Sequence, residues 1–185
     1  GGINFMKIMI ASDIHGSAYF CEKMLERFEG EKADKLLLLG DILYHGPRND
    51  LPKAYEPKKV IEMLNAISDK ILCVRGNCDT EVDQMVLKFP VLAEYCILYL
   101  QNRMIFATHG HKLNPQNLPP LSKGDILLNG HTHIPKFTDN GEFIYINPGS
   151  VSIPKENSEH SYIMLEDNQF TFKNLDGEVY ARYTV

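Results

Sequence analysis

Five short apolar runs recur along this chain, and each ends at a polar segment that contains glycine together with Asp, Asn or His. The runs cover residues 7–11, 36–39, 71–74, 104–107 and 126–128. A run this short and this apolar is typical of a strand buried on both faces, as in a sheet covered by helices. Ligands and metals collect at the carboxyl edge of such strands. The repeated pattern therefore predicts an α/β fold that gathers polar side chains at one edge of its core, with Asp41 in the middle of the set.

The first half of the chain predicts strands alternating with helices. Ser17 is expected to cap a helix that ends near Gly30, and Pro57 is well suited to the first position of a second helix. A third helix is expected to start at Asp79, with acidic residues in its first turns. Its expected buried face consists of Val82, Met85, Val86 and Phe89. A strand, a helix and a strand in this order indicate parallel strands joined by a right-handed crossover.

The second half predicts antiparallel strands with little helix. Short turns separate its β-rich segments, and Asn-Gly and Asp-Gly are the strongest short hairpin signals. These turns are Gln101-Asn102, Asn140-Gly141, Asp167-Asn168 and Asp176-Gly177. Residues 113–121 contain three prolines and are expected to form an irregular surface loop. The pattern favours two packed sheets with helices outside, in one domain of residues 6–185. Residues 1–5 are interpreted as a tag remnant or a disordered start.

The composition is that of a soluble globular protein. Hydrophobic residues make up 44% and charged residues 23% of the 185 residues, and no apolar run approaches the roughly 20 residues of a membrane helix. The start lacks the pattern of a signal peptide, and the four cysteines form no C-x-x-C pair, so a reducing cytoplasm is the expected location. A net charge of −5 argues against binding to long nucleic acid, which relies on a basic face of the protein.

The polar segments that follow the apolar runs supply a set of candidate metal ligands. The set is Asp13, His15, Asp41, Asn77, His109, His131 and His133. This is too many for one ion and suits two ions that share a carboxylate, which can clamp a phosphate for in-line attack by a hydroxide held between them. Mixed imidazole and carboxylate ligands favour transition metals over Mg²⁺ or Ca²⁺. We therefore expect two divalent ions, with Mn²⁺ first and Fe, Zn or Ni as alternatives.

The ordered motifs resemble those of the calcineurin-like metallophosphoesterase superfamily. They are Asp13-x-His15, Gly40-Asp41, Gly76-Asn77-x-Asp79, His109 and Gly130-His131-x-His133, and finer features at residues 45–49, 75–79 and 147–150 are similar to small bacterial YfcE-type phosphodiesterases. The resemblance covers residues 7 to about 150. It implies a four-layer α/β/β/α sandwich. It also implies that Asp13, His15, Asp41 and His133 hold one metal, while Asp41, Asn77, His109 and His131 hold the other.

Cys78 is a departure from this pattern. Most of the superfamily has histidine directly after the asparagine, where it contacts the phosphate or protonates the leaving group. A thiol is a weaker donor and cannot carry the positive charge of imidazolium. We expect Asn77 to stabilise charge on the phosphate, and Cys78 to act as a poor general acid or to be a small buried residue without a role. Good activity is then expected only on diesters with easy leaving groups, or with another residue as proton donor. Asp79 either orients Cys78 or caps the helix.

The loop after Asp41 supplies two candidate substrate contacts. Arg48 matches phosphate oxygens through paired hydrogen bonds, and the alternative interpretation is a solvated surface arginine. His45 precedes it in the same loop and is a weaker candidate. The leading hypothesis is a dinuclear metal-dependent phosphodiesterase acting on a small phosphodiester. The alternative is a metal-binding interaction scaffold without turnover, similar to the Vps29 subunit of retromer, and a homodimer or homotetramer is possible for either.

Overall fold

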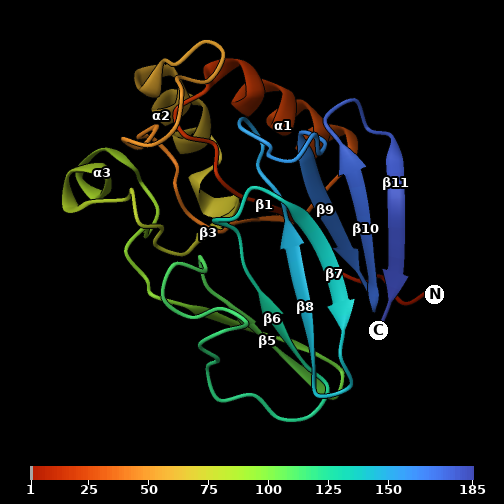
Figure 1. The fold of residues 1–185 in the computed structure, drawn as a ribbon. Helices are drawn as coiled ribbons and strands as arrows, with labels where there is room; N and C mark the ends of the chain where they lie inside the picture. Colours follow the sequence, from red (N-terminus) through yellow and green to blue (C-terminus); the bar gives the residue numbers. More distant parts are fainter. Residues whose placement is uncertain (1) are drawn as a thin grey trace.

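The computed structural model describes residues 2–185, and it contains two β-sheets and a small group of helices (Figure 1). Of the expected leading segment 1–5, Gly1 lies outside the described residues, and residues 2–6 form neither helix nor strand. The elements in chain order are β1 (Lys7–Ala11), α1 (Ala18–Gly30), β2 (Lys35–Leu38), α2 (Pro57–Asn65), the 3₁₀ turn η1 (Ser68–Lys70), β3 (Ile71–Cys73), α3 (Glu81–Val86), β4 (Cys96–Leu100), β5 (Arg103–Ala107), β6 (Asp125–Leu128), β7 (Pro135–Asp139), β8 (Phe143–Pro148), β9 (Ser161–Glu166), β10 (Gln169–Asn174) and β11 (Val179–Thr184).

Both sheets are mixed. The first has the strand order β11-β10-β9-β1-β2-β3, in which β1, β2 and β3 are parallel and β9, β10 and β11 are antiparallel additions. The second has the order β4-β5-β6-β8-β7, with parallel β5, β6 and β8 flanked by antiparallel neighbours. The expected hairpin turns at residues 101–102, 140–141, 167–168 and 176–177 each join two paired strands. The predicted pair of mixed sheets is confirmed.

The four leucines at residues 36–39 explain why the two sheets pack together. Leu36 and Leu38 face the cluster that includes residues of α1 and α2, whereas Leu37 and Leu39 face the cluster between the sheets. Side chains alternate between the two faces of a strand, so a strand with a helix layer on one face and a second sheet on the other must be apolar throughout. All four leucines have 0% exposure, as the uninterrupted apolar run predicts.

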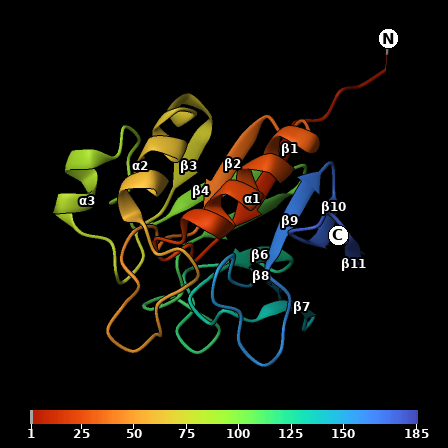
Figure 2. The same ribbon diagram turned by 90° about the horizontal axis from the view of Figure 1, so that it is seen from above.

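Two helices cover the outer face of the first sheet (Figure 2). Helix α1 begins after Ser17, whose side-chain oxygen accepts a hydrogen bond from the backbone nitrogen of Phe20 at 3.2 Å. Helix α2 begins with Pro57, where the missing N–H leaves no donor unsatisfied. Both predicted starting positions are confirmed, and the apolar side of each helix packs on the sheet.

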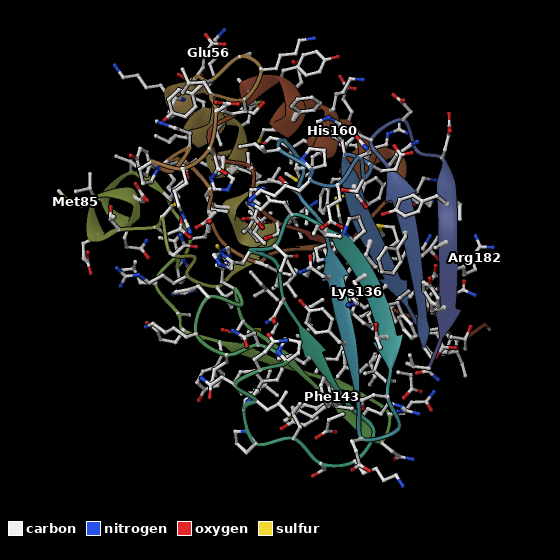
Figure 3. The ribbon with its side chains drawn as sticks, viewed as in Figure 1. Glu56, Met85, Lys136, Phe143, His160 and Arg182 are labelled. Carbon is white, nitrogen blue, oxygen red and sulfur yellow. The ribbon has the colours of Figure 1, made fainter. Side chains whose placement is uncertain are left out.

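The prediction for the third helix was wrong in its start and for three of its four expected buried side chains; Phe89 is buried but lies beyond the end of the helix. Helix α3 has six residues and begins after Thr80, which forms a capping box with Asp83. Three side chains of the expected buried face are exposed: Val82 by 66%, Met85 by 83% and Val86 by 42%. Met85 projects away from the body of the protein (Figure 3). Six residues make less than two turns, which is too short for an apolar stripe to dock along its length.

The outer face of the second sheet is covered differently from the first. Phe106, Leu127 and Tyr145 on this face pack against Leu113 and Leu121, which come from the proline-containing loop after β5. An irregular loop thus stands where a second helical layer was expected, and every helix in the described chain lies between residues 18 and 86. No helix among residues 2–185 is long and apolar enough to cross a membrane.

Candidate metal centre

The seven candidate ligands follow five strands that belong to both sheets. Asp13 and His15 follow β1, Asp41 follows β2, Asn77 follows β3, His109 follows β5, and His131 and His133 follow β6. Three long loops, orange, green and blue in Figure 2, extend on the same side of the molecule. Positive φ angles occur at Asp13 (58°), His15 (50°), Asp41 (57°), His131 (69°) and His133 (62°). Left-handed backbone is unfavourable for residues with a Cβ atom, so the fold holds most of this set in a strained conformation.

One cluster joins Asp13, His15 and His133. The Asp13 Oδ1 atom lies 3.1 Å from His133 Nε2 and 3.3 Å from His15 Nε2. The two Nε2 atoms are 3.3 Å apart, although their residues are separated by 118 positions in the chain. All three side chains are buried, with exposures of 0 to 3%. The three ligand atoms therefore converge on one point inside the protein.

A second cluster lies beside the first and joins Asp41, Asn77, His109 and His131. His109 Nε2 lies 3.2 Å from Asp41 Oδ2, 3.0 Å from Asn77 Oδ1 and 3.2 Å from His131 Nδ1. The same Asp41 Oδ2 atom is 3.6 Å from His15 Nε2 in the first cluster. Asp41 thus lies between the two clusters, and the structure brings all seven predicted ligands together.

Backbone carbonyls orient three of the histidines. In each case Nδ1–H donates to a carbonyl oxygen, which can only accept, so the neutral ring has its lone pair at Nε2. The bonds run from His15 to Tyr44 (2.8 Å), from His109 to Leu39 (2.6 Å) and from His133 to Ile153 (2.7 Å). This is the arrangement that metal-ligating histidines use to fix the tautomer and the direction of the ring. Each free Nε2 atom points into one of the two clusters.

The donor set fits positively charged ions. Lone pairs on oxygen and nitrogen face each other at 3.0 to 3.3 Å, which is repulsive unless a cation or a proton lies among them. Asp13 Oδ1 is fully buried and accepts no hydrogen bond from the protein. A buried carboxylate oxygen without a partner is costly, and a bound cation satisfies it. The residues present are therefore suited to divalent metal ions.

The pKa values of the metal-free centre show the same demand for positive charge. Burial alone would lower the pKa of His109, but Asp13 and Asp41 outweigh it and raise that pKa to about 9. Burial would raise the pKa of Asp13, yet the neighbouring histidines, His109 foremost, hold it well below its usual range. Burial and then the charge of His109 lower the pKa of His131 to about 4. A proton on His109 therefore occupies, in the absence of metal, a place that a cation can take.

Buried donors hold the two carboxylates in place. Asp13 Oδ2 accepts hydrogen bonds from Ser12 Oγ at 2.6 Å and from the backbone nitrogen of His131 at 2.9 Å. Asp41 Oδ1 accepts one from the backbone nitrogen of Cys78 at 2.8 Å. Each carboxylate also packs against a glycine, because a Cβ atom on Gly130 would lie 2.8 Å from Asp13 Oδ2 and one on Gly76 would collide with Asp41. The glycines are required here for space beside the carboxylates.

Asp79 has a role that the sequence did not predict. Its carboxylate accepts hydrogen bonds from three backbone nitrogens, those of Asp41 (2.8 Å), Ile42 (3.0 Å) and Gly76 (2.7 Å). It therefore neither caps α3, which Thr80 does, nor serves chiefly to orient Cys78. Asp79 fixes the backbone on both sides of the contact between Asp41 and Gly76.

An open cavity of about 350 Å³ adjoins the centre. Its lining includes Asp41, Asn77, Cys78, His131 and His133, and on its outer side Arg48 and Lys155. The Cys78 sulfur lies within 4.8 Å of ligand atoms of His15 and Asp41. Burial, followed by the nearby Asp41, raises the pKa of this thiol to about 12, so it is protonated at neutral pH.

The lining differs from the sequence-based candidates at two residues. His45 is absent from the lining; its ring lies between Tyr44 and Tyr55, with centroids 4.7 and 5.1 Å away. The predicted contact of His45 with substrate stays a prediction. Lys155 was not predicted, because it follows no apolar run and reaches the cavity only through the pairing of its loop with His133.

The fold and the centre together define a phosphoesterase, and the chain belongs to the calcineurin-like phosphoesterase superfamily, whose domain matches residues 6–169. Phosphodiesterase YfcE of Escherichia coli K12 is 51% identical over 163 residues, which cover 88% of this chain and 89% of that protein. The structure of the E. coli phosphoesterase YfcE superposes with a TM-score of 0.93 at 48% identity, covering 97% of this chain and 99% of that one. The predicted family, fold class and enzyme class are confirmed.

The similarity of the fold extends to a more distant protein. Zinc-bound Vps29 of Entamoeba histolytica superposes with a TM-score of 0.62 at 21% identity, covering 97% of this chain and 99% of that one. At this level of identity the comparison concerns the fold alone.

Proposed function

We propose that this protein is a dinuclear metal-dependent phosphodiesterase that hydrolyses small phosphodiesters. The observation that carries the proposal is the convergence of acceptor atoms in two adjacent clusters, with Asp41 between them. The 51% identity to a protein named as a phosphodiesterase supports diesters as the substrate class. The cavity of about 350 Å³ supports a small substrate, and the net charge of −5 speaks against long nucleic acid.

The ligand set supports two separate metal positions. Asp13, His15 and His133 would hold one ion and Asn77, His109 and His131 the other, with Asp41 shared between them. Two bound divalent ions would polarise the phosphate and lower the pKa of a water that attacks phosphorus in line. Four imidazoles with two carboxylates and one amide favour Mn²⁺, with Fe, Zn or Ni as alternatives.

The remaining steps are assigned to side chains that line the cavity. Asn77 directs Oδ1 toward His109, so its amide N–H₂ group is available to a nonbridging phosphate oxygen, where negative charge develops. Arg48 lines the same cavity and would neutralise negative charge carried by the bound substrate. A protonated thiol carries no positive charge, so Cys78 would be a weaker proton donor to the leaving group than an imidazolium at this position. This arrangement favours leaving groups that depart without a proton.

The assay that tests the proposal uses two model substrates. Metal-free protein is titrated with Mn²⁺, and hydrolysis of bis-p-nitrophenyl phosphate and of p-nitrophenyl phosphate is followed. Asp41→Asn is measured beside Asp69→Asn, an exposed carboxylate on η1 that serves as the matched control. Manganese-dependent cleavage of the diester, weaker on the monoester and lost only in Asp41→Asn, supports the proposal. Two bound ions without turnover under any transition metal would contradict it.

A scaffold similar to Vps29 is the second candidate, and one observation favours it. Val82, Met85 and Val86 expose an apolar surface on α3, and Met85 projects away from the body of the protein (Figure 3). Such a surface suits a protein partner or a second copy in a homodimer or homotetramer. The same assay separates the candidates, because a scaffold binds metal without turnover. Light scattering of wild type and of Met85→Glu measures whether this surface joins copies of the chain.

We also propose a cytoplasmic location. Cys21, Cys73, Cys78 and Cys96 are all free thiols, and free thiols persist in reducing compartments. Fractionation of cells that express the tagged protein tests this assignment.

A further inference from the structure

Two cations on the rim of the cavity have no partner among the residues that the structure describes. Arg48 and Lys155 both line it, and within residues 2–185 neither side chain forms an ion pair or a hydrogen bond. Other cations of the protein do find carboxylates, as Arg75 does with Glu81 and Lys112 with Glu94. Among the described residues of the lining, Asp41 is the one acidic side chain, and it belongs to the metal centre.

Both cations stand on loops that are tied to the centre. The Arg48 loop is closed by Asn49, whose side chain donates to the His45 carbonyl at 2.8 Å. It also packs on the centre, since a Cβ atom on Gly46 would lie 3.3 Å from the Cys78 sulfur. The Arg48 loop is therefore held against Cys78 at the edge of the centre.

The Lys155 loop is attached to a candidate ligand at two points. The Lys155 backbone nitrogen donates to the carbonyl of His133 at 3.0 Å, and the Ile153 carbonyl accepts from His133 Nδ1 at 2.7 Å. Ser158 Oγ then closes the loop by donating to the Lys155 carbonyl at 2.6 Å. This backbone arrangement keeps the Lys155 side chain at the mouth of the cavity.

The charge of the site exceeds what one phosphodiester needs. The candidate ligands include only two carboxylates, Asp13 and Asp41, so the protein would not neutralise two divalent ions. The attacking hydroxide and a phosphodiester would each bring one negative charge, which balances the two ions and leaves Arg48 and Lys155 as the excess. Arg48 and Lys155 raise the positive potential beside the bound phosphodiester. This potential favours a substrate that carries more than one negative charge.

We propose that Arg48 and Lys155 form a subsite for a phosphomonoester group on one arm of the phosphodiester. The inference rests on the proposed function and narrows its substrate class to diesters with a second phosphate. An arginine and a lysine match a dianionic phosphate, because the guanidinium can bind two oxygens and the ammonium adds a point charge. Diesters with uncharged arms would leave the subsite empty.

A matched pair of substrates tests this subsite. Thymidine 5′-(p-nitrophenyl phosphate) and its 3′-phosphorylated form share the scissile bond and the leaving group and differ in one phosphate. We expect kcat/KM to be about tenfold higher for the phosphorylated form, mainly through a lower KM, and the preference to shrink at high salt. Arg48→Gln/Lys155→Gln should reduce the ratio to about one, whereas Lys58→Gln, an exposed lysine of α2, should keep it.

Binding of products separates this inference from the proposed function. Calorimetry on the Mn²⁺-loaded protein compares thymidine 3′,5′-bisphosphate with thymidine 5′-monophosphate and needs no turnover. Tighter binding of the bisphosphate in wild type, lost in the double variant, supports the subsite even if hydrolysis fails. A ratio within about twofold of one in wild type, or a preference that survives in the double variant, overturns it.

Discussion

The carboxylate of Asp79 accepts a hydrogen bond from the backbone nitrogen of Asp41 at 2.8 Å, so one buried acid holds the backbone of another. Each has 2% exposure, and Asp79 also bonds the nitrogens of Ile42 and Gly76. A side chain outside the centre thus determines where the shared carboxylate stands.

Asp79→Asn should destabilise the protein and weaken the centre. The amide has one acceptor oxygen, so at least one of the three buried N–H groups loses its partner, at a cost of about 1–3 kcal/mol. Urea unfolding of metal-free protein measures the loss, and Mn²⁺ titration measures the affinity. Asp69→Asn is the exposed control. A urea midpoint of Asp79→Asn equal to that of wild type would contradict the prediction.

Gly130→Ala should disturb the Asp13 cluster through volume alone. The added methyl group would meet Ser12 Oγ and Asp13 Oδ2, both buried, and overpacking of this kind costs about 1–3 kcal/mol. We expect lower thermal stability and a loss of metal affinity, measured by calorimetry. Gly30→Ala at the end of α1, where the nearest atom lies 3.6 Å away, is the control and should not be destabilising. Unchanged affinity in Gly130→Ala would count against the described packing.

A thiol at position 78, in place of an imidazolium, predicts a steep dependence of rate on the leaving group. In a series of aryl and alkyl diesters, kcat/KM should fall sharply as the pKa of the leaving group rises. Cys78→His should flatten this dependence, with a gain on the order of 10²-fold for the poorest leaving group. Cys78→Ser, another neutral donor, should keep the slope of wild type. Equal slopes in wild type and Cys78→His would show that the position takes no part in proton transfer.

Cys21 predicts a loss of stability at alkaline pH. Burial raises the pKa of its thiol to about 12, while in the unfolded chain it ionises near its usual value of about 8.5. The raised folded pKa means that stability is fully present below about pH 8.5 and falls as the pH rises from there toward 12. At about pH 10 the loss from this thiol is about 2 kcal/mol. The stability difference between wild type and Cys21→Ala should shrink by that amount between neutral pH and pH of about 10.

Cys96 supplies the control for this titration. It is only half-buried, so Cys96→Ala should change the pH dependence of unfolding less than Cys21→Ala does. If the free energy of unfolding had the same pH dependence in wild type and Cys21→Ala, the raised pKa of Cys21 would be contradicted.

Local pattern was sufficient for the strands and for the ligands at their ends. The leucines at 36–39 predict a strand buried on both faces because every side chain of the run is apolar, and all four are buried. The α3 face was mispredicted because a few apolar residues at helical spacing do not show whether the helix reaches a neighbour. The carbonyls that orient His15, His109 and His133 could not be predicted, since every residue has one and only the fold selects which is used.

The contact between His15 and His133 spans 118 positions of the chain and joins loops from two different sheets. No fragment that ends before β6 contains both histidines. A growing chain on the ribosome therefore cannot assemble the first cluster until most of the chain has been synthesised. Ions that bind this cluster then recognise only the docked sheets and stabilise the finished fold over the unfolded chain. Metal binding at this cluster therefore follows the docking of the two sheets, and it reports that this docking has taken place.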